Sequence, residues 1–112
     1  MTVDTAGNVF ISSSYHGRIY KITASTGVLS AVAGQDRWNG GYNGDGIPAS
    51  TATLNYPRDI TVDALDNTFF VDYSNNRIRK ISASTGIISS VVGSSRALYD
   101  YCTSNKYDND AL

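Results

Sequence analysis

The sequence predicts an all-β protein built from two copies of a four-stranded antiparallel unit. Three observations carry this prediction. The segment from Val3 to Gly34 aligns without a gap on the segment from Val62 to Gly93, an offset of 59 residues at which 15 of 32 positions are identical. Apolar residues recur at every second position in short runs, and turn residues separate the runs. An internal repeat of this size indicates an array of small units that share one core.

The second copy shows its four strands most clearly. We expect them over 59–63, 68–72, 77–82 and 87–92. In the first strand, Ile60 and Val62 lie on one face, whereas 68–72 is apolar almost throughout, as a strand packed on both faces would be. Clusters of Asp, Asn, Ser and Gly stand between the strands and predict tight turns. Four short strands joined in this way form one antiparallel meander.

The first copy repeats these turns, but its innermost strand is short because only three residues precede Asp4. Gly27 and Gly86 close the third hairpin of each copy and are predicted to be left-handed. Asn8 and Asn67, in the first turn of each copy, tolerate the same conformation.

A long connector rich in Gly and Asn joins the two copies. We expect an ordered loop anchored by Trp38, Ile47 and Leu54, with a turn of helix within 49–54. Pro57 then suits the first position of the next inner strand, where a missing N–H is tolerated.

These residues resemble NHL repeats, the units of a family of β-propellers. The resemblance rests on Val62-Asp63, on the stretches 67–72 and 75–81, and on the ending Val91-Val92-Gly93. The Gly-Asp-Gly motif at 44–46 and the residues up to Pro57 resemble the connector of a long-repeat subgroup. The resemblance covers most of residues 1–93. It implies blades packed around a central channel, typically six of them in this family.

On this interpretation the chain is an incomplete NHL-like β-propeller made of two four-stranded antiparallel blades. The segments are a first blade with a truncated inner strand (1–34), an inter-blade loop (35–56), a second blade (57–93) and a divergent tail (94–112). Propellers close with about four to eight blades. The chain is therefore expected to be a fragment of a longer protein, a subunit that completes a ring by self-assembly, or a truncated product.

Composition excludes some functions. The net charge is −1, with nine basic and ten acidic residues, so strong attraction to a nucleic-acid backbone is not expected. No apolar run reaches the roughly 18–20 residues of a membrane span, and the start does not resemble a signal peptide. The single Cys102 cannot form an internal disulfide. The cellular compartment is not indicated.

Three motifs could carry chemistry, and each has a simpler interpretation. The loop Asn43–Gly46 could offer oxygens to Ca²⁺, but the EF-hand pattern is absent, and we expect Asp45 to bond loop backbone groups. Asp72 is likewise predicted to accept backbone N–H bonds at the turn after it. His16 and Cys102 are single residues of their kind, so neither a zinc set nor a nucleophilic pair is predicted. No cofactor, metal or catalytic residue is expected.

Basic residues recur at equivalent positions of the two copies. The repeated residues are Arg18 and Arg77, followed by Lys21 and Lys80. In the second copy, Arg77, Arg79 and Lys80 could form a small positive patch, and some NHL domains bind RNA. Several aspartates in the second copy offset this charge, so ion pairing across strands or simple solvation is the favoured interpretation.

Aromatic residues in the loops suggest a recognition surface, because aromatics are enriched where partners dock. The candidate interaction residues are Tyr15, Trp38, Tyr42, Tyr73 and Arg77. Anchoring of the long loops explains the aromatics equally well.

The favoured function is a non-catalytic scaffold that presents loops to a protein, peptide or glycan. The alternative is a fragment of a propeller enzyme, of lyase or lactonase type, whose site lies in further blades; RNA binding is third. Fold alone does not separate these functions.

Overall fold

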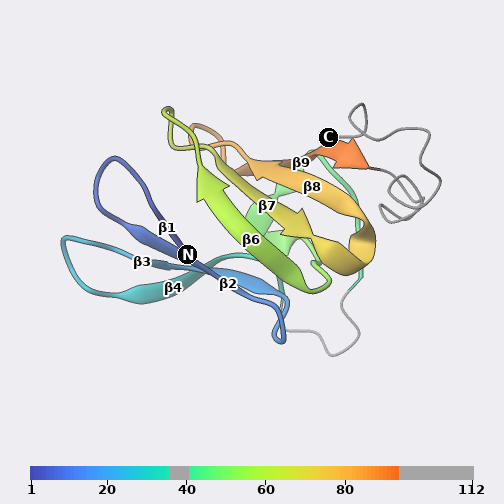
Figure 1. Ribbon diagram of the computed structural model, residues 1–112, viewed down its shortest axis with the longest axis horizontal. Helices are drawn as coiled ribbons and strands as arrows, with labels where there is room; N and C mark the ends of the chain where they lie inside the picture. The colour runs from blue at the N-terminus through green and yellow to red at the C-terminus, as the bar shows by residue number, and fades with distance from the viewer. Residues whose placement is uncertain (36–40, 94–112) are drawn as a thin grey trace.

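The computed structural model describes residues 1–35 and 41–93, and its all-β fold confirms the predicted class. The strands form two antiparallel sheets that pack beside each other (Figure 1). The first sheet has the order β1-β2-β3-β4, with β1 (Thr2–Val3), β2 (Val9–Ser13), β3 (Arg18–Ile22) and β4 (Leu29–Ala33). The second has the order β5-β9-β8-β7-β6, with β5 (Ile47–Pro48), β6 (Pro57–Val62), β7 (Thr68–Asp72), β8 (Arg77–Ile81) and β9 (Ile87–Gly93). The strands β1–β4 and β6–β9 each form one open four-stranded meander, as expected for a propeller blade.

The second sheet has one strand more than the repeat predicts. The connector supplies it: β5 pairs with the outer strand β9, with Ile47 opposite Ile88. The 3₁₀ turn η1 (Ala49–Thr51) follows at once, within the range where a helical turn was expected. A second 3₁₀ turn, η2 (Tyr73–Asn75), joins β7 to β8. Neither turn in the described part of the chain is a helix long and apolar enough to cross a membrane.

The hairpin turns follow the repeat. Gly27 and Gly86 adopt φ of 72° and 73°, which confirms the predicted left-handed conformation. At the first turn of each copy the prediction is wrong by one residue, because the left-handed residues are Gly7 and Asp66, which precede the two asparagines. The asparagine side chains are used for bonding instead: Asn67 Nδ2 donates to Asp63 Oδ2 at 3.1 Å, and Asn67 Oδ1 accepts from the backbone of Ala83 at 2.9 Å.

Strand register assigns the side chains to two faces of each sheet, since paired residues share a face. We call face A the face that carries Ile11, Tyr20 and Leu29 in the first sheet. In the second sheet, face A carries their repeat equivalents Phe70, Arg79 and Ile88. The opposite side of each sheet is face B, which includes Phe10 and Ile19 in the first sheet.

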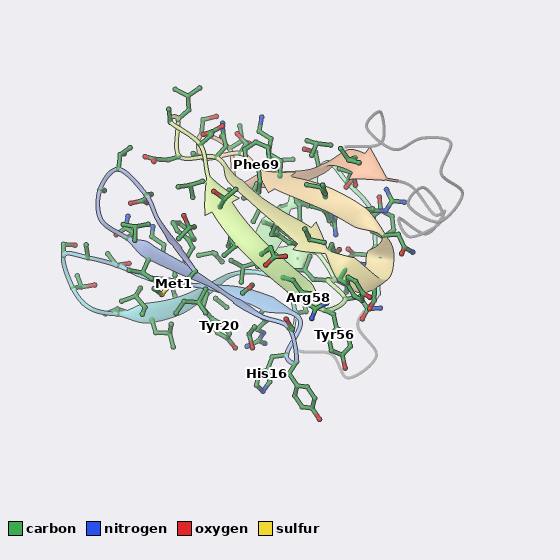
Figure 2. The ribbon with its side chains drawn as sticks, in the orientation of Figure 1. Met1, His16, Tyr20, Tyr56, Arg58 and Phe69 are labelled. Carbon is green, nitrogen blue, oxygen red and sulfur yellow. The ribbon has the colours of Figure 1, made fainter. Side chains whose placement is uncertain are left out.

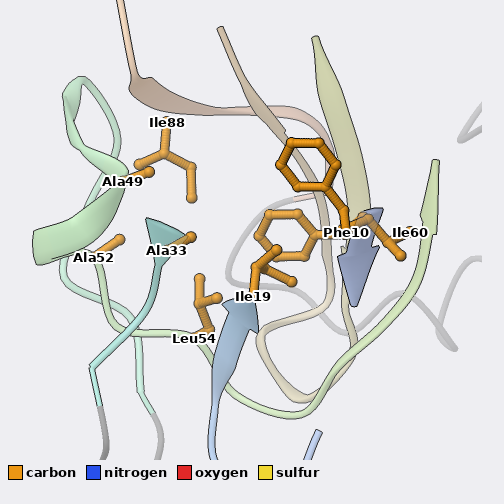
Figure 3. Packing of buried hydrophobic residues seen from close by; sticks show 9 residues of the cluster. Phe10, Ile19, Ala33, Ala49, Ala52, Leu54, Ile60 and Ile88 are labelled. Atoms are coloured by element: carbon orange, nitrogen blue, oxygen red, sulfur yellow. The ribbon is translucent and has the colours of Figure 1, made fainter. Parts of the chain in front are cut away.

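The core lies between face B of the first sheet and face A of the second, with the connector filling the outer part of the gap. Its buried residues are Phe10, Ile19, Ala33, Ala49, Ala52, Leu54, Ile60, Phe70 and Ile88. Figure 3 shows Ala49 and Ala52 of the connector beside Ala33 and Ile88, while Phe10 and Ile60 meet on the other side of the cluster. Sheets that radiate from a common axis diverge outwards, so the connector acts as the filler of a wedge.

Candidate functional site

Three loops meet at one end of the two sheets and form a continuous surface. They are the β2–β3 turn, the segment that leads into β6, and η2. Ser14 Oγ donates to the carbonyl of Pro57 at 2.7 Å, which ties the first loop to the second. The backbone N–H of Ser74 donates to the carbonyl of Asn55 at 2.9 Å, which ties the second to the third. The loops therefore present their side chains as one unit.

Large side chains project from this surface, which we call the rim surface and define by Tyr15, His16, Tyr56, Arg58 and Tyr73. The three tyrosines are 76%, 47% and 54% exposed, in that order. The guanidinium carbon of Arg58 lies 4.7 Å from the centroid of the Tyr73 ring, and the rings of Tyr15 and His16 meet edge to face at 6.0 Å. Figure 2 shows His16, Tyr56 and Arg58 at the same end of the molecule.

The backbone beneath the rim surface is unusual. Tyr56 and Asp59 are non-glycine residues with φ of 59° and 38°, and they flank the dipeptide Pro57-Arg58. The register of β6 against β7 also shifts between Arg58 and Ile60, so Asp59 is a bulge residue. A bulky residue in the left-handed region persists only where the surrounding structure holds it, and such sites cluster at functional positions.

A buried ion pair supports this loop from below. Asp72 and Arg79 are both fully buried, and Arg79 Nη1 donates to Asp72 Oδ2 at 3.1 Å. The other oxygen, Asp72 Oδ1, accepts from the backbone N–H of Asn55 at 2.7 Å. Asn75 Nδ2 donates to Asp72 Oδ2 at 2.8 Å. Because Asn55 and Asn75 adjoin the loops of the rim surface, this carboxylate helps to fix their positions.

Asp72 therefore has a larger role than a turn residue. The prediction that it accepts backbone bonds at the following turn is wrong: its backbone donor is Asn55, which precedes it by 17 positions. Burial raises the pKa of Asp72, while the hydrogen bonds from Asn55, Asn75 and Arg79 act in the opposite direction.

Arg79 also holds the Gly-Asp-Gly loop of the connector. Its Nη2 donates to the carbonyl of Gly44 at 2.7 Å and pairs with Asp45 Oδ1 at 3.2 Å. Asp45 further accepts from Tyr42 and Ser90, at 2.9 and 3.0 Å. The expectation that Asp45 bonds loop backbone is wrong, since these three donors are all side chains. We call the set Asp45, Asp72 and Arg79 the connector clamp.

The electrostatics of the clamp follow from these contacts. Partial burial alone would raise the pKa of Asp45, but hydrogen bonds from Ser90 and Tyr42 and the charge of Arg79 outweigh it and hold the pKa below its ordinary value. The carboxylate of Asp45 is thus bonded within the chain by the guanidinium and two hydroxyls. This occupation of its oxygens argues against the calcium interpretation of the loop.

The structure separates the residues predicted for an interaction surface. Tyr15 and Tyr73 lie on the rim surface. Tyr42 stacks at 3.9 Å on the guanidinium of Arg77, whose side chain is only 14% exposed and lies 4.0 Å from Asp45, so these two belong to the clamp region. Trp38 lies outside the described residues.

Sequence reasoning missed Tyr56 and Arg58. Their signal was their position on either side of Pro57, at the point where a connector becomes an inner strand and therefore reaches the end of a blade. The proposed positive patch does not form as such, because Arg79 is buried and paired with carboxylates.

The other chemical candidates are placed as follows. His16 is exposed at its turn, as expected, and its Nδ1 lies 3.0 Å from Ser13 Oγ. Cys102 lies outside the described residues. Within residues 1–35 and 41–93, no three or more His, Cys, Asp or Glu side chains are grouped so that they could hold a metal ion.

Two open meanders joined by a wedge-filling connector define a segment of an NHL-type β-propeller. A family model described as "Teneurin NHL domain" matches residues 1–107, and the chain belongs to this family.

The chain is similar to human Teneurin-4, with 36% identity over 99 residues, and to mouse Teneurin-4, with 34% identity over the same length. These alignments cover 80% of the chain but only 4% of either relative. A crystal structure of a protein of unknown function from Bacteroides thetaiotaomicron VPI-5482 is also similar. Its TM-score is 0.66 at 27% identity, and the match covers 79% of this chain and 21% of that one.

Proposed function

We propose that this chain is a non-catalytic interaction module that binds a protein or peptide through the rim surface. The observation that carries the proposal is the stacking of Arg58 on Tyr73, on a surface that also exposes Tyr15 and Tyr56. Tyrosine and arginine are the residue types enriched among interface hot spots, together with tryptophan. A stacked guanidinium keeps its N–H edge available for a partner while its face is already packed.

Preorganisation supports the same function. Ordering of loops on binding lowers affinity, and loops fixed in advance avoid that cost. Here hydrogen bonds join the three loops, and Asp72 supports them from below. The rim side chains thus project from a backbone that is held in place before any partner arrives.

Peptide selection tests the proposal. The full chain is screened against a displayed library of random 12-residue peptides, and a glycan array is run in parallel. Replacing Tyr15, Arg58 or Tyr73 by alanine is expected to weaken the selected peptides by about tenfold or more each, because hot-spot truncations cost above about 1.4 kcal/mol. Leu65→Ala is the matched control, since Leu65 is 78% exposed in the β6–β7 turn at the opposite end of the blade.

Two outcomes would count against the proposal. If the folded chain selects no peptide, the proposed peptide-binding function is wrong. If peptides are selected but their affinity is unchanged by all three rim substitutions, the binding site lies outside the rim surface. Glycan binding that depends on the same three residues would keep the surface but change the partner class.

A further inference from the structure

The two sheets are repeat copies, yet within residues 1–35 and 41–93 only the second has a connector packed against its face A. In the second sheet the inner part of face A, with Ile60 and Phe70, packs on the first sheet. The outer part, with Arg77, Arg79 and Ile88, is covered by the connector. One blade face is thus divided between a neighbouring blade and a connector.

The first sheet carries the same face A without such a cover among the described residues. β4 is the edge strand of its sheet, and Val28 and Leu29 at its start are 57% and 58% exposed. The equivalent edge strand β9 is covered by β5. Tyr20, the equivalent of Arg79, projects away from the second sheet (Figure 2). An edge strand of this kind is a template for strand addition.

Arg18 on face A of the first sheet favours a docking segment that carries a carboxylate. Its equivalent Arg77 lies 4.0 Å from the carboxylate of Asp45 and stacks on the ring of Tyr42, both of which are connector residues. Arg18 Nε is buried and has no hydrogen-bond partner within the described part of the chain. A buried donor without a partner costs about 1–3 kcal/mol, so an acceptor at this place would stabilise the fold.

The first sheet differs from the second at two positions of the clamp. Ser13 stands where the second sheet has Asp72, and Tyr20 stands where it has Arg79. No buried ion pair is possible there. A segment that docks on this face therefore has one cation to match, Arg18, whereas Arg79 in the second sheet is paired through its Nη atoms with Asp72 and Asp45.

We propose that face A of the first sheet binds an extended connector of the 41–56 type, supplied by a neighbouring repeat of a longer chain. Its carboxylate pairs with Arg18, its small apolar residues fill the outer wedge, and two of its residues pair with β4. This inference does not depend on the rim surface.

The hydrogen-bond pattern gives the binding a local signature. Ile88 O accepts from the backbone N–H of Gly46 at 2.8 Å, so the peptide groups of Ile88 face β5. Both backbone groups of a residue in an antiparallel strand point to the same neighbour. The equivalent residue in β4 is Leu29, whose N–H accordingly points to the open edge. Its exchange with solvent deuterium reports whether a connector is docked.

A graft tests the proposal with the chain's own sequence. Residues 35–60 are duplicated and joined directly before Thr2, because Thr61, the next residue in the parent sequence, aligns with Thr2. The graft is expected to slow exchange of the Leu29 amide by about tenfold or more, since pairing moves this group from fraying to structured backbone.

Two substitutions separate a specific clamp from general stabilisation. In the grafted chain, Arg18→Gln, or Asp45→Asn in the grafted copy, is expected to reduce the protection of Leu29 by about two- to fivefold, the range of a partly exposed ion pair. Lys80→Gln is the matched control, because it removes the same charge on the opposite face of the other sheet. Equal effects of Arg18→Gln and Lys80→Gln would overturn the assignment to Arg18.

A second measurement covers a graft that does not fold. A peptide with the sequence of residues 41–56 is titrated at millimolar concentration into the full chain, with a scrambled peptide as the control. Amide shifts at Leu29 but not at Ile88 are expected, and they should weaken in Arg18→Gln. No shift at Leu29 would overturn the proposal. So would a Leu29 amide that is protected without any addition and loses its protection when residues 94–112 are deleted.

Discussion

Replacing Asp72 by serine, the residue at the equivalent position 13, is expected to lower the free energy of unfolding by about 3–5 kcal/mol, the cost of breaking a buried ion pair. The substitution removes the acceptor for the backbone N–H of Asn55, for Asn75 Nδ2 and for Arg79 Nη1. Three lost bonds at about 1.5 kcal/mol each give about 4.5 kcal/mol, which agrees with that range. Arg79 would then stay buried with Asp45 as its only described counter-charge.

The first copy also supplies the partner substitution. Arg79→Tyr alone leaves the Asp72 carboxylate buried without its counter-charge. The double variant Asp72→Ser with Arg79→Tyr removes both charges. Replacing a whole buried pair costs much less than breaking it. The double variant is therefore expected to be more stable than the sum of the two single losses predicts, by at least about 1 kcal/mol.

Urea unfolding followed by far-UV circular dichroism measures these differences. It is run at two protein concentrations, because association would make the apparent stability depend on concentration. Thr61→Ser is the control, since Thr61 is exposed in β6 and surface changes away from special backbone positions usually stay within about 0.5 kcal/mol. A loss below about 1 kcal/mol for Asp72→Ser, or strictly additive effects, would refute the coupling inferred from the buried contact.

Three further outcomes are expected. In the same unfolding assay, Gly93→Ala should lower the free energy of unfolding by at least about 2 kcal/mol, because the added Cβ would lie 2.1 Å from the carbonyl oxygen of Asn76. Gly27→Ala should lower it by about 1 kcal/mol, because Gly27 also has a positive φ but its Cβ would meet open space. The pKa of Asp45 in the folded chain lies below its ordinary value of 3.8. The ionised carboxylate therefore stabilises the folded state fully above pH 3.8, and this stabilisation is lost as the pH falls below that value. The stability difference between the wild-type chain and Asp45→Asn should therefore narrow as the pH falls below 3.8, and a difference that widens would contradict the sign. Light scattering of the isolated chain should show trimers or larger aggregates, and a cooperatively melting monomer would show that two blades suffice.

Local patterns in the sequence determined the strands and the fold class. The predicted strand 68–72 coincides with β7, and Gly27 and Gly86 close their hairpins in the left-handed conformation. Such features depend on residues only a few positions apart, because alternation along a strand and turn chemistry are local properties. The internal repeat then assigned the same strands to the first copy, and its motifs indicated the NHL family.

Local sequence patterns predicted only some residues of the candidate site. Tyr15 and Tyr73 could be selected from the sequence as loop aromatics. That they lie on one surface with Tyr56 and Arg58 depends on hydrogen bonds between separate loops. Tyr42 and Arg77 satisfied the same sequence criteria and lie in the clamp region instead, since stacking on a neighbour does not show in residue type.

The tertiary structure alone decided how the connector is used. Asp45 meets Arg79 across 34 positions, and Ile47 pairs with Ile88 across 41, so no local pattern announces either contact. Burial turned Arg79 from a predicted surface cation into the centre of the clamp. The reason is geometric: sheets that diverge from an axis leave a wedge, and whichever segment fills it determines which polar groups lose their water and must find partners in the chain.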